Sequence, residues 1–289
     1  MKHLSVISNK TKDPNMNCAA LIADYAKSLG ADCEICDFDP SKSEGKSSYN
    51  ARYVDANMID DKTECVIVLG GDGTLIQAAR EICKKDIPLL GINIGTLGFL
   101  TEVEFKDYQL AIHSLINDQY SIQERMMLKG SIIRDNQILY SNDALNDIVI
   151  TRHGDLRVID MDVTVNGDYL TSYTADGIII STATGSTAYS LSAGGPIIEP
   201  QAKLFLMTPI CPHSLNHRSI VLSDSNKIKI NMLNSRNDNE PRTVTFDGEQ
   251  FFRVKTHDQI LIERSDIVAK LIITQNRDNF LKRVSDKLM

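Results

Sequence analysis

The chain has 289 residues, of which 42% are hydrophobic and 24% charged, so its composition is that of a globular protein and its length predicts two domains. A net charge of −7 with scattered Lys and Arg argues against a nucleic-acid partner, because non-specific binding needs clustered positive charge. No apolar run is long enough to span a bilayer and residues 1–13 turn polar too early for a secretory signal, so we expect a cytoplasmic protein with no membrane partner.

The first hundred residues alternate strand-like and helix-like segments. The predicted strands cover residues 4–7, 32–38, 65–69 and 87–92, and the predicted helices cover residues 15–29 and 75–84. This alternation predicts an α/β domain over residues 1–100. Cys33 and Cys36 form a single C-x-x-C within a predicted strand, which favours a buried structural pair over a metal or redox site.

The pattern changes at about Met126 to short alternating runs with turn residues between them. Asn166-Gly167 and Asp247-Gly248 each separate two such runs and predict β-hairpins, because these tight turns need positive φ at two residues. We therefore expect residues 101–275 to form a β-rich, sandwich-like domain. Residues 276–289 return to helical spacing, and we expect this C-terminal helix to return to the N-terminal domain.

The strongest local motif is Gly70-Gly71-Asp72-Gly73-Thr74, between a predicted strand and a predicted helix. Glycines let the backbone approach a phosphate closely, and a helix N-terminus directs its N–H groups at the anion. An Asp at this position can accept a proton from an attacking hydroxyl or help to hold a metal, as phosphoryl transfer requires. In a lone glycine-rich turn, however, the more common role of such an Asp is to cap the helix.

Three further segments carry polar side chains near predicted strand ends. Residues 91–100 form a second glycine-punctuated turn, which either rims the same cleft as the first or simply packs against the sheet. Asn146-Asp147 offers an amide and a carboxylate that suit the hydroxyls of a ribose, with an ordinary turn as the alternative. Residues 174–196 are rich in Ser, Thr and Gly around Tyr189, whose ring can stack on a heterocycle. Because the chain has neither a P-loop nor a G-x-G-x-x-G motif, any nucleotide is bound by a different scheme.

In this order, the four segments resemble the NAD kinase family, whose motifs include a GGDGT turn, an N-E/D pair and a TGSTAY loop. The resemblance extends across roughly the whole chain and includes residues 124–128 and 211–218. It implies a nucleotide-binding N-terminal domain, a β-rich domain that carries the dinucleotide site, and a homodimer or homotetramer. The implied reaction transfers the γ-phosphoryl group of ATP to the 2′-hydroxyl of the adenosine ribose of NAD, giving NADP, with Mg²⁺ as the metal ion.

The same resemblance implies roles for individual residues, of which Asp72 is the catalytic one, near the acceptor hydroxyl. The residues implied to bind phosphate and ATP are Gly70, Gly71 and Thr74. Those implied to bind NAD are Gly73, Asn146, Asp147, Asp176, Thr184, Thr187, Ala188 and Tyr189. No metal ligand is assigned. Two positions depart from the family pattern, because Asp147 stands where many members carry Glu and Ala183 where Pro is frequent.

Two other functions remain open. Lipid kinases of the diacylglycerol and sphingosine type share a GGDGT turn, but the loop over residues 184–189 and the lack of a basic amphipathic or lipid-anchoring segment favour a dinucleotide. A non-catalytic protein that senses NAD or NADP is the second alternative, which the intact Asp72 disfavours. His213 and His217 have the i, i+4 spacing of metal ligands, but Pro212 and the lack of a nearby third ligand favour a loop or domain contact.

Overall fold

The computed structural model describes residues 1–36, 56–101, 103–152, 158–213, 218–233, 242–274 and 280–288. The chain divides into two compact units, Met1–Glu124 with Val268–Met289, and Arg125–Ile267. The boundary falls after Glu124 and not after residue 100, because helix α3 (Tyr108–Ile116) buries Ile112 and Leu115 in the core of the first unit. The C-terminal residues from Val268 onward also belong to the first unit, which agrees with the return expected from the sequence.

The first unit is built on a parallel sheet with the strand order β2-β1-β3-β4. Its strands are β1 (His3–Ser8), β2 (Asp32–Cys36), β3 (Cys65–Gly70) and β4 (Leu89–Asn93), and β4 also pairs in parallel with β5 (Val103–Glu104) and with the end of β17 (Gln259–Ile273). Strand β3 is buried along its whole length, as expected of a central parallel strand. Cys33 and Cys36 are buried free thiols, and desolvation raises the pKa of each to about 11.

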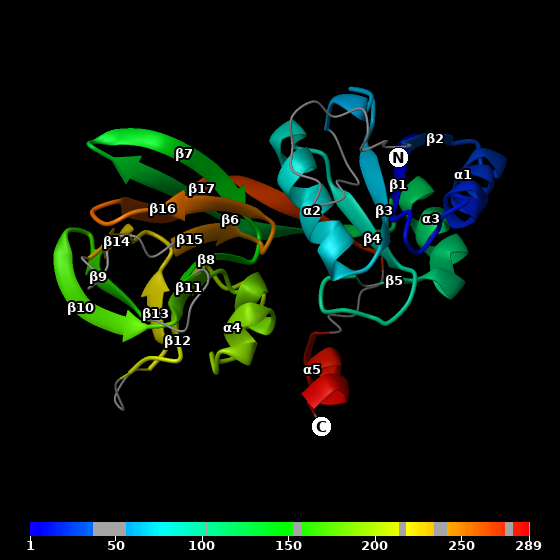
Figure 1. Ribbon diagram of the computed structural model, residues 1–289. Coiled ribbons are helices and arrows are strands. Elements are labelled where there is room, and N and C mark those ends of the chain that lie inside the picture. Colours follow the sequence, from blue (N-terminus) through cyan, green and yellow to red (C-terminus); the bar gives the residue numbers. More distant parts are fainter. Residues whose placement is uncertain are drawn as a thin grey trace. The chain divides into compact units, whose positions relative to one another are not determined.

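Helices cover both faces of this sheet (Figure 1). On one face, α1 (Asn17–Ser28) and α3 share an apolar core with the strands, and α2 (Asp72–Ile82) lies on the other. The C-terminal helix α5 (Phe280–Leu288) is tied to the second glycine-punctuated turn, because Arg283 donates from Nη1 to the carbonyl oxygen of Phe99 at 2.6 Å. Short 3₁₀ helices cover Ala56–Met58, Cys83–Lys85 and Phe105–Asp107. No helix in the described part of the chain is both long and apolar enough to cross a membrane.

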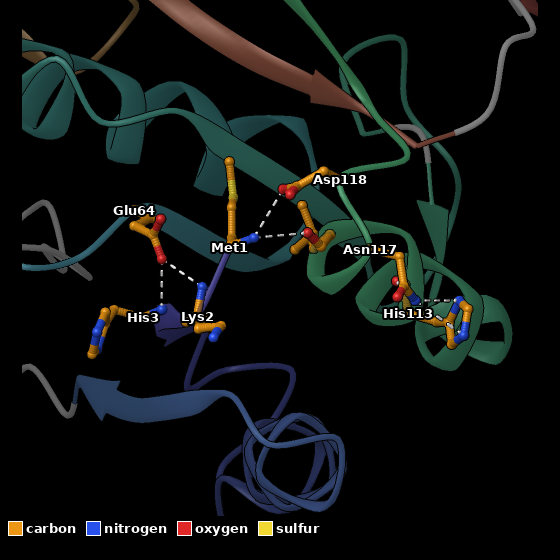
Figure 2. A network of polar contacts seen from close by, with 8 residues as sticks. Met1, Lys2, His3, Glu64, His113, Asn117 and Asp118 are labelled. Carbon is orange, nitrogen blue, oxygen red and sulfur yellow. Dashed lines mark hydrogen bonds and ion pairs between the residues drawn. The ribbon is translucent and has the colours of Figure 1, made fainter.

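The amino edge of the sheet is held by the start of the chain (Figure 2). The carboxylate of Glu64 accepts the backbone N–H groups of Lys2 and His3 at 2.5 and 2.9 Å. The Met1 ammonium group donates to the Asp118 carboxylate at 3.0 Å. These contacts join β1 to the segments that precede β3 and follow α3, at the edge opposite to the two glycine-rich turns.

The second unit consists of two sheets that share one apolar core. The first has the order β13-β12-β11-β8-β15-β16, and the second contains β10-β9-β14-β17, with β6 paired to both β17 and β7. The strands are β6 (Ser121–Arg134), β7 (Gln137–Ala144), β8 (Asp147–Arg152), β9 (Ile159–Val165), β10 (Asp168–Ala175), β11 (Gly177–Ser181), β12 (Leu204–Ile210), β13 (Ile220–Ser223), β14 (Ile228–Met232), β15 (Arg242–Phe246) and β16 (Gln250–Val254). Ile180 and Phe246 of the first sheet and Val163 and Ile260 of the second belong to the same core. This is the sandwich-like arrangement expected from the alternating sequence pattern.

Both predicted hairpin turns are present in the second unit. Asn166 and Gly167, with φ of 53° and 94°, join β9 to β10. Asp247 and Gly248, with φ of 51° and 72°, join β15 to β16. Positive φ at two successive residues is the turn geometry that matches the twist of paired strands, so local sequence alone identifies these hairpins.

Candidate active site

The carboxyl ends of β1, β3 and β4 bring three polar segments to one edge of the first unit's sheet. The backbone N–H of Asn9 donates to the Leu69 carbonyl oxygen, and the backbone N–H of Ile94 donates to the Gly70 carbonyl oxygen, both at 2.9 Å. The helices that follow β1 and β3 lie on opposite faces, so the strand order reverses between these two strands. Ligands of open α/β sheets bind at the carboxyl edge where this reversal occurs, which places a candidate site at the glycine-rich turn after β3.

Helix α2 begins inside the glycine-rich motif, at Asp72 and not at residue 75. Its N-cap is Gly71, and no side chain caps the helix, so the capping role considered for Asp72 is excluded. The first backbone N–H groups of a helix have no partner within the helix and are available to an anion. The Thr74 side chain is buried and its hydroxyl oxygen accepts from Asn9 Nδ2 at 2.9 Å, and the Thr74 backbone N–H in the first turn of α2 is a group that can bind a phosphate.

The Asp72 carboxylate joins the two glycine-rich turns. Its Oδ2 accepts the Phe99 N–H at 2.6 Å, and its Oδ1 accepts the N–H groups of Leu100 and Thr101 and the Thr101 hydroxyl, each at 3.1 Å. A Cβ on Gly98 would collide with this carboxylate, which explains a glycine there. Three of the four donors bind Oδ1, so Oδ2 keeps acceptor capacity for a hydroxyl proton.

Lys12 is a charged residue at this edge that the sequence analysis did not identify. Its Nζ would lie 3.2 Å from a Cβ built on Gly71 and 3.4 Å from one built on Gly95, so the ammonium group lies beside both turns. It forms no ion pair with the residues that the structure describes. The signal available in the sequence was only its position in the polar segment that follows β1.

In the second unit, Asn146 and Asp147 are both more than nine-tenths buried, at the start of β8. Asn146 Oδ1 is buried and accepts no hydrogen bond from any described residue, and the adjacent Asp147 carboxyl group is strongly desolvated. Buried polar atoms are nearly always hydrogen-bonded, so the unpartnered Asn146 Oδ1 beside a buried carboxyl group indicates a missing polar partner. An ordinary turn does not explain this burial.

The backbone around this pair is fixed from two sides. Thr182 donates from its backbone N–H to the Asn146 carbonyl oxygen at 2.9 Å and from its hydroxyl to the Leu145 carbonyl oxygen at 2.7 Å. On the other side, the Asp247 carboxylate accepts the backbone N–H groups of residues 145, 146 and 147 at 3.0, 2.7 and 3.2 Å. Asp247 was identified in the sequence only as a turn residue, so this second role was missed.

The Ser- and Thr-rich segment packs directly on the same pair. It forms a 3₁₀ helix (Thr184–Thr187) followed by α4 (Tyr189–Ser192), and a Cβ on Gly185 would collide with the Asn146 carbonyl oxygen. Thr184 is buried, Thr187 and Ala188 are half-buried, and the Tyr189 side chain is 45% exposed. The structure therefore packs the start of this segment, through Thr182 and Gly185, on Asn146, and the Tyr189 residue is accessible. Direct roles of Thr184, Thr187, Ala188 and Tyr189 stay predictions.

Asp176 lies apart from this cluster. Asp176 directly precedes β11, whereas the Ser- and Thr-rich segment follows the last residue of this strand. The length of β11 therefore separates Asp176 from that segment by about 17 Å. Its carboxylate accepts from Arg152 Nε at 2.9 Å. His213 donates its backbone N–H to the Thr174 carbonyl oxygen, and His217 lies outside the described residues. A direct role for Asp176 beside Asn146 within one chain stays a prediction.

Burial and a neighbouring carboxylate raise the pKa of Asp147 to about 7, with desolvation as the larger cause and Asp247 as the second. The folded state then holds a proton that the unfolded state has already lost between about pH 4 and 7. The stability that the folded state gains from the protonated Asp147 is fully present below about pH 4 and is lost as the pH rises through 7.

We therefore expect the wild-type protein to lose about 2–3 kcal/mol of unfolding free energy between pH 5 and 8 relative to Asp147→Asn, which cannot titrate. Urea unfolding of both proteins at several pH values measures this difference. A difference that stays constant across the range would show that Asp147 does not titrate there.

A pocket of about 820 Å³ lies elsewhere in the first unit, at the amino edge of the sheet. Several of its charged lining residues are paired with one another, for example Lys85 with Asp61 at 3.0 Å and the Met1 ammonium with Asp118. None of the residues implied by the sequence lines it. The candidate functional residues are therefore those at the carboxyl edge of the first unit and, separately, the buried Asn146-Asp147 pair of the second unit.

Comparison with known proteins gives matches in both units. Residues 19–120 match the ATP-NAD kinase N-terminal domain and residues 145–274 match the ATP-NAD kinase C-terminal domain. The chain is 47% identical to the NAD kinase of Lachnospira eligens, covering 100% of both chains, and 38% identical to that of Lachnoclostridium phytofermentans, covering 97% and 96%. Its fold is similar to that of yeast NADH kinase complexed with NADH (TM-score 0.82, 24% identity, 100% and 87% covered) and of an NAD kinase from Archaeoglobus fulgidus in complex with ATP (0.74, 22%, 99% and 98%).

Proposed function

The chain belongs to the NAD kinase family, and on that premise we propose that it transfers the γ-phosphoryl group of ATP to the 2′-hydroxyl of the adenosine ribose of NAD, giving NADP and ADP. The observation that supports the dinucleotide assignment is the buried Asn146-Asp147 pair, in which Asn146 Oδ1 has no hydrogen-bond partner among the described residues. An amide and a carboxyl group side by side can bind two vicinal hydroxyls, as a ribose requires. A diacylglycerol offers one hydroxyl and would leave part of this buried pair unsatisfied.

Asp72 is the proposed general base. As the ribose oxygen attacks the γ-phosphorus, its proton passes to Asp72 Oδ2, the bond to the bridging oxygen breaks, and ADP leaves with the electron pair. The hydrogen bonds from Phe99, Leu100 and Thr101 hold the carboxylate in one position before the reaction. Such pre-organisation matters because phosphoryl transfer depends chiefly on positioning and charge stabilisation.

The proposed phosphate contacts come from the turn after β3. Gly70 and Gly71 let the backbone approach the anion, and the Thr74 backbone N–H lies in the uncapped first turn of α2. We add Lys12 to this group, because its ammonium lies beside Gly71 and carries the charge that a polyphosphate needs. The remaining proposed NAD contacts are Gly73, Asp176, Thr184, Thr187, Ala188 and Tyr189.

Mg²⁺ fits this site as a partner of the nucleotide. No three acidic, His or Cys side chains in the described ranges lie close enough to form a protein metal cage. Mg²⁺ is commonly held by one or two carboxylates together with substrate phosphates, and Asp72 can supply such a carboxylate. When bound, the ion would neutralise charge on the transferred phosphoryl group.

We further propose that the enzyme acts as a cytoplasmic homodimer or homotetramer.

The proposed reaction is tested by offering the purified protein ATP and Mg²⁺ with NAD, with a diacylglycerol, or with neither. We expect NADP only in the NAD reaction, and no NADP when EDTA removes the metal. A phosphorylated lipid would support the lipid-kinase alternative. Tight NAD binding without NADP formation would support a sensor.

Gly73→Ala separates a ligand contact from a structural role. A Cβ at this position meets no atom within 4 Å, and the residue is helical, so Ala should stabilise the fold by about 0.5–1 kcal/mol. If NAD lies against Gly73, the same methyl group should raise KM for NAD. Thermal unfolding and steady-state kinetics measure the two effects, and a stabilised variant with unchanged kinetics would remove Gly73 from the substrate site.

A further inference from the structure

We infer that Asp247 is a positioning residue for NAD, because its carboxylate holds the backbone of the Asn146-Asp147 pair in the conformation that receives the ribose. This inference rests on the proposed function, since it deepens the role of that pair. Asp247 itself does not have to touch the substrate.

The geometry of this contact is specific. Three consecutive N–H groups, those of residues 145, 146 and 147, converge on the two oxygens of Asp247, and its own N–H donates to the Asp147 carbonyl oxygen at 3.0 Å. Asp247 is 100 to 102 residues away from them in sequence and is held by its place in the β15–β16 hairpin. The hairpin turn and the start of β8 are thus locked together in both directions.

The charge of Asp247 is needed for this arrangement. A carboxylate offers two acceptor oxygens and bonds N–H groups more strongly than a neutral acceptor, whereas an Asn offers one oxygen and places donors opposite the remaining N–H groups. A second carboxylate close to a buried Asp147 is electrostatically unfavourable. The arrangement is therefore explained better by orientation of the pair than by stability.

The effect of losing this charge should be local. Thr182 still binds the carbonyl oxygens of residues 145 and 146 from the other side, so the strand remains anchored. The substitution removes the contacts that orient the backbone N–H groups of residues 145–147, so the Asn146 and Asp147 side chains lose their fixed direction. Misplacement of a binding group by about 1 Å can cost up to 10²-fold in rate.

The test compares Asp247→Asn with Asp258→Asn. Asp258 is a matched control because it is a buried Asp of the same unit, in the connection between β16 and β17, where it accepts from Arg134 and from the Lys255 N–H. We expect Asp247→Asn to raise KM and Kd for NAD by about 10-fold to 10²-fold, with KM for ATP changed by less than about twofold. The control should keep its Kd for NAD even if its thermal stability falls further.

A charge-restoring variant and amide hydrogen exchange distinguish a positioning role of Asp247 from a general loss of stability. Asp247→Glu, which restores the charge, should recover part of the NAD affinity. Hydrogen exchange of the amides of residues 145–147 should accelerate in Asp247→Asn and not in the control, and this readout does not depend on catalysis. Unchanged exchange and unchanged Kd for NAD would overturn the inference. Wild-type protein without NAD kinase activity would instead contradict the proposed function, whatever the exchange result.

Discussion

Asp72→Asn is expected to lower kcat by about 10²–10⁴-fold, the factor that a positioned general base typically contributes. Asn keeps the Oδ1 acceptor for Leu100 and Thr101 but turns the acceptor of the Phe99 N–H into a donor group. We therefore expect a folded protein with a small loss of stability, near-normal affinity for NAD and very slow turnover. Steady-state kinetics at saturating NAD and ATP measure kcat, and thermal unfolding measures the loss of stability.

Thr101→Val is the matched control for this prediction. It removes the hydroxyl's hydrogen bonds to Asp72 Oδ1 and from Asn93 Nδ2 while it keeps the charge of Asp72 and nearly the same volume, so stability should fall but kcat should change little. If Asp72 acts mainly through the metal, excess Mg²⁺ or Mn²⁺ should restore part of the activity of Asp72→Asn. Near-normal turnover of Asp72→Asn at ordinary Mg²⁺ would leave the carboxylate with only its structural role of joining the two turns.

Gly185→Ala is expected to abolish measurable NAD binding and to destabilise the second unit. Its Cβ would overlap backbone atoms of Asn146, the residue that precedes the central strand β8, and backbone atoms cannot rotate away as a flexible side chain could. Overpacking of this kind typically costs about 1–3 kcal/mol and shifts the backbone. Because the displaced atoms carry the Asn146 side chain, affinity for NAD should fall even in the molecules that remain folded.

Calorimetric NAD titration and urea unfolding of Gly185→Ala measure these two effects. Gly73→Ala serves as the comparison for stability, because it adds the same methyl group where no atom lies within 4 Å. A Gly185→Ala protein with wild-type stability and affinity would mean that the loop does not pack on Asn146 as closely as the structure indicates.

Features set by local sequence were predictable. The parallel strand β3, the turn after it and both hairpins depend on short patterns of apolar residues, glycines and Asn or Asp, and each is present where expected. The start of α2 was misplaced by three residues, because helix propensity argues against glycines in a helix and tertiary context overrode it. Helix α3 was missed because its residues 108–116 were assigned to the β-rich segment.

Features that depend on distant pairing were not predictable from motifs. The contact of Asp72 with Phe99 follows from the register of β3 and β4, in which Gly70 pairs with Asn93. The contact of Asp247 with residues 145–147 follows from the pairing of β15 with β8 across about 100 residues of sequence. No local pattern records either pairing, so the sequence identifies the polar residues without the partners that orient them.

Transfer of label from [γ-³²P]ATP shows directly which atom of NAD accepts the phosphoryl group. The protein is incubated with labelled ATP and Mg²⁺ and either NAD or an NAD analogue that lacks the 2′-hydroxyl on the adenosine ribose. We predict label in the dinucleotide with NAD, none with the analogue, and competitive inhibition of NAD by the analogue because the rest of the molecule still binds. Label on the analogue at a rate comparable to NAD, or no label on either dinucleotide, would contradict this account.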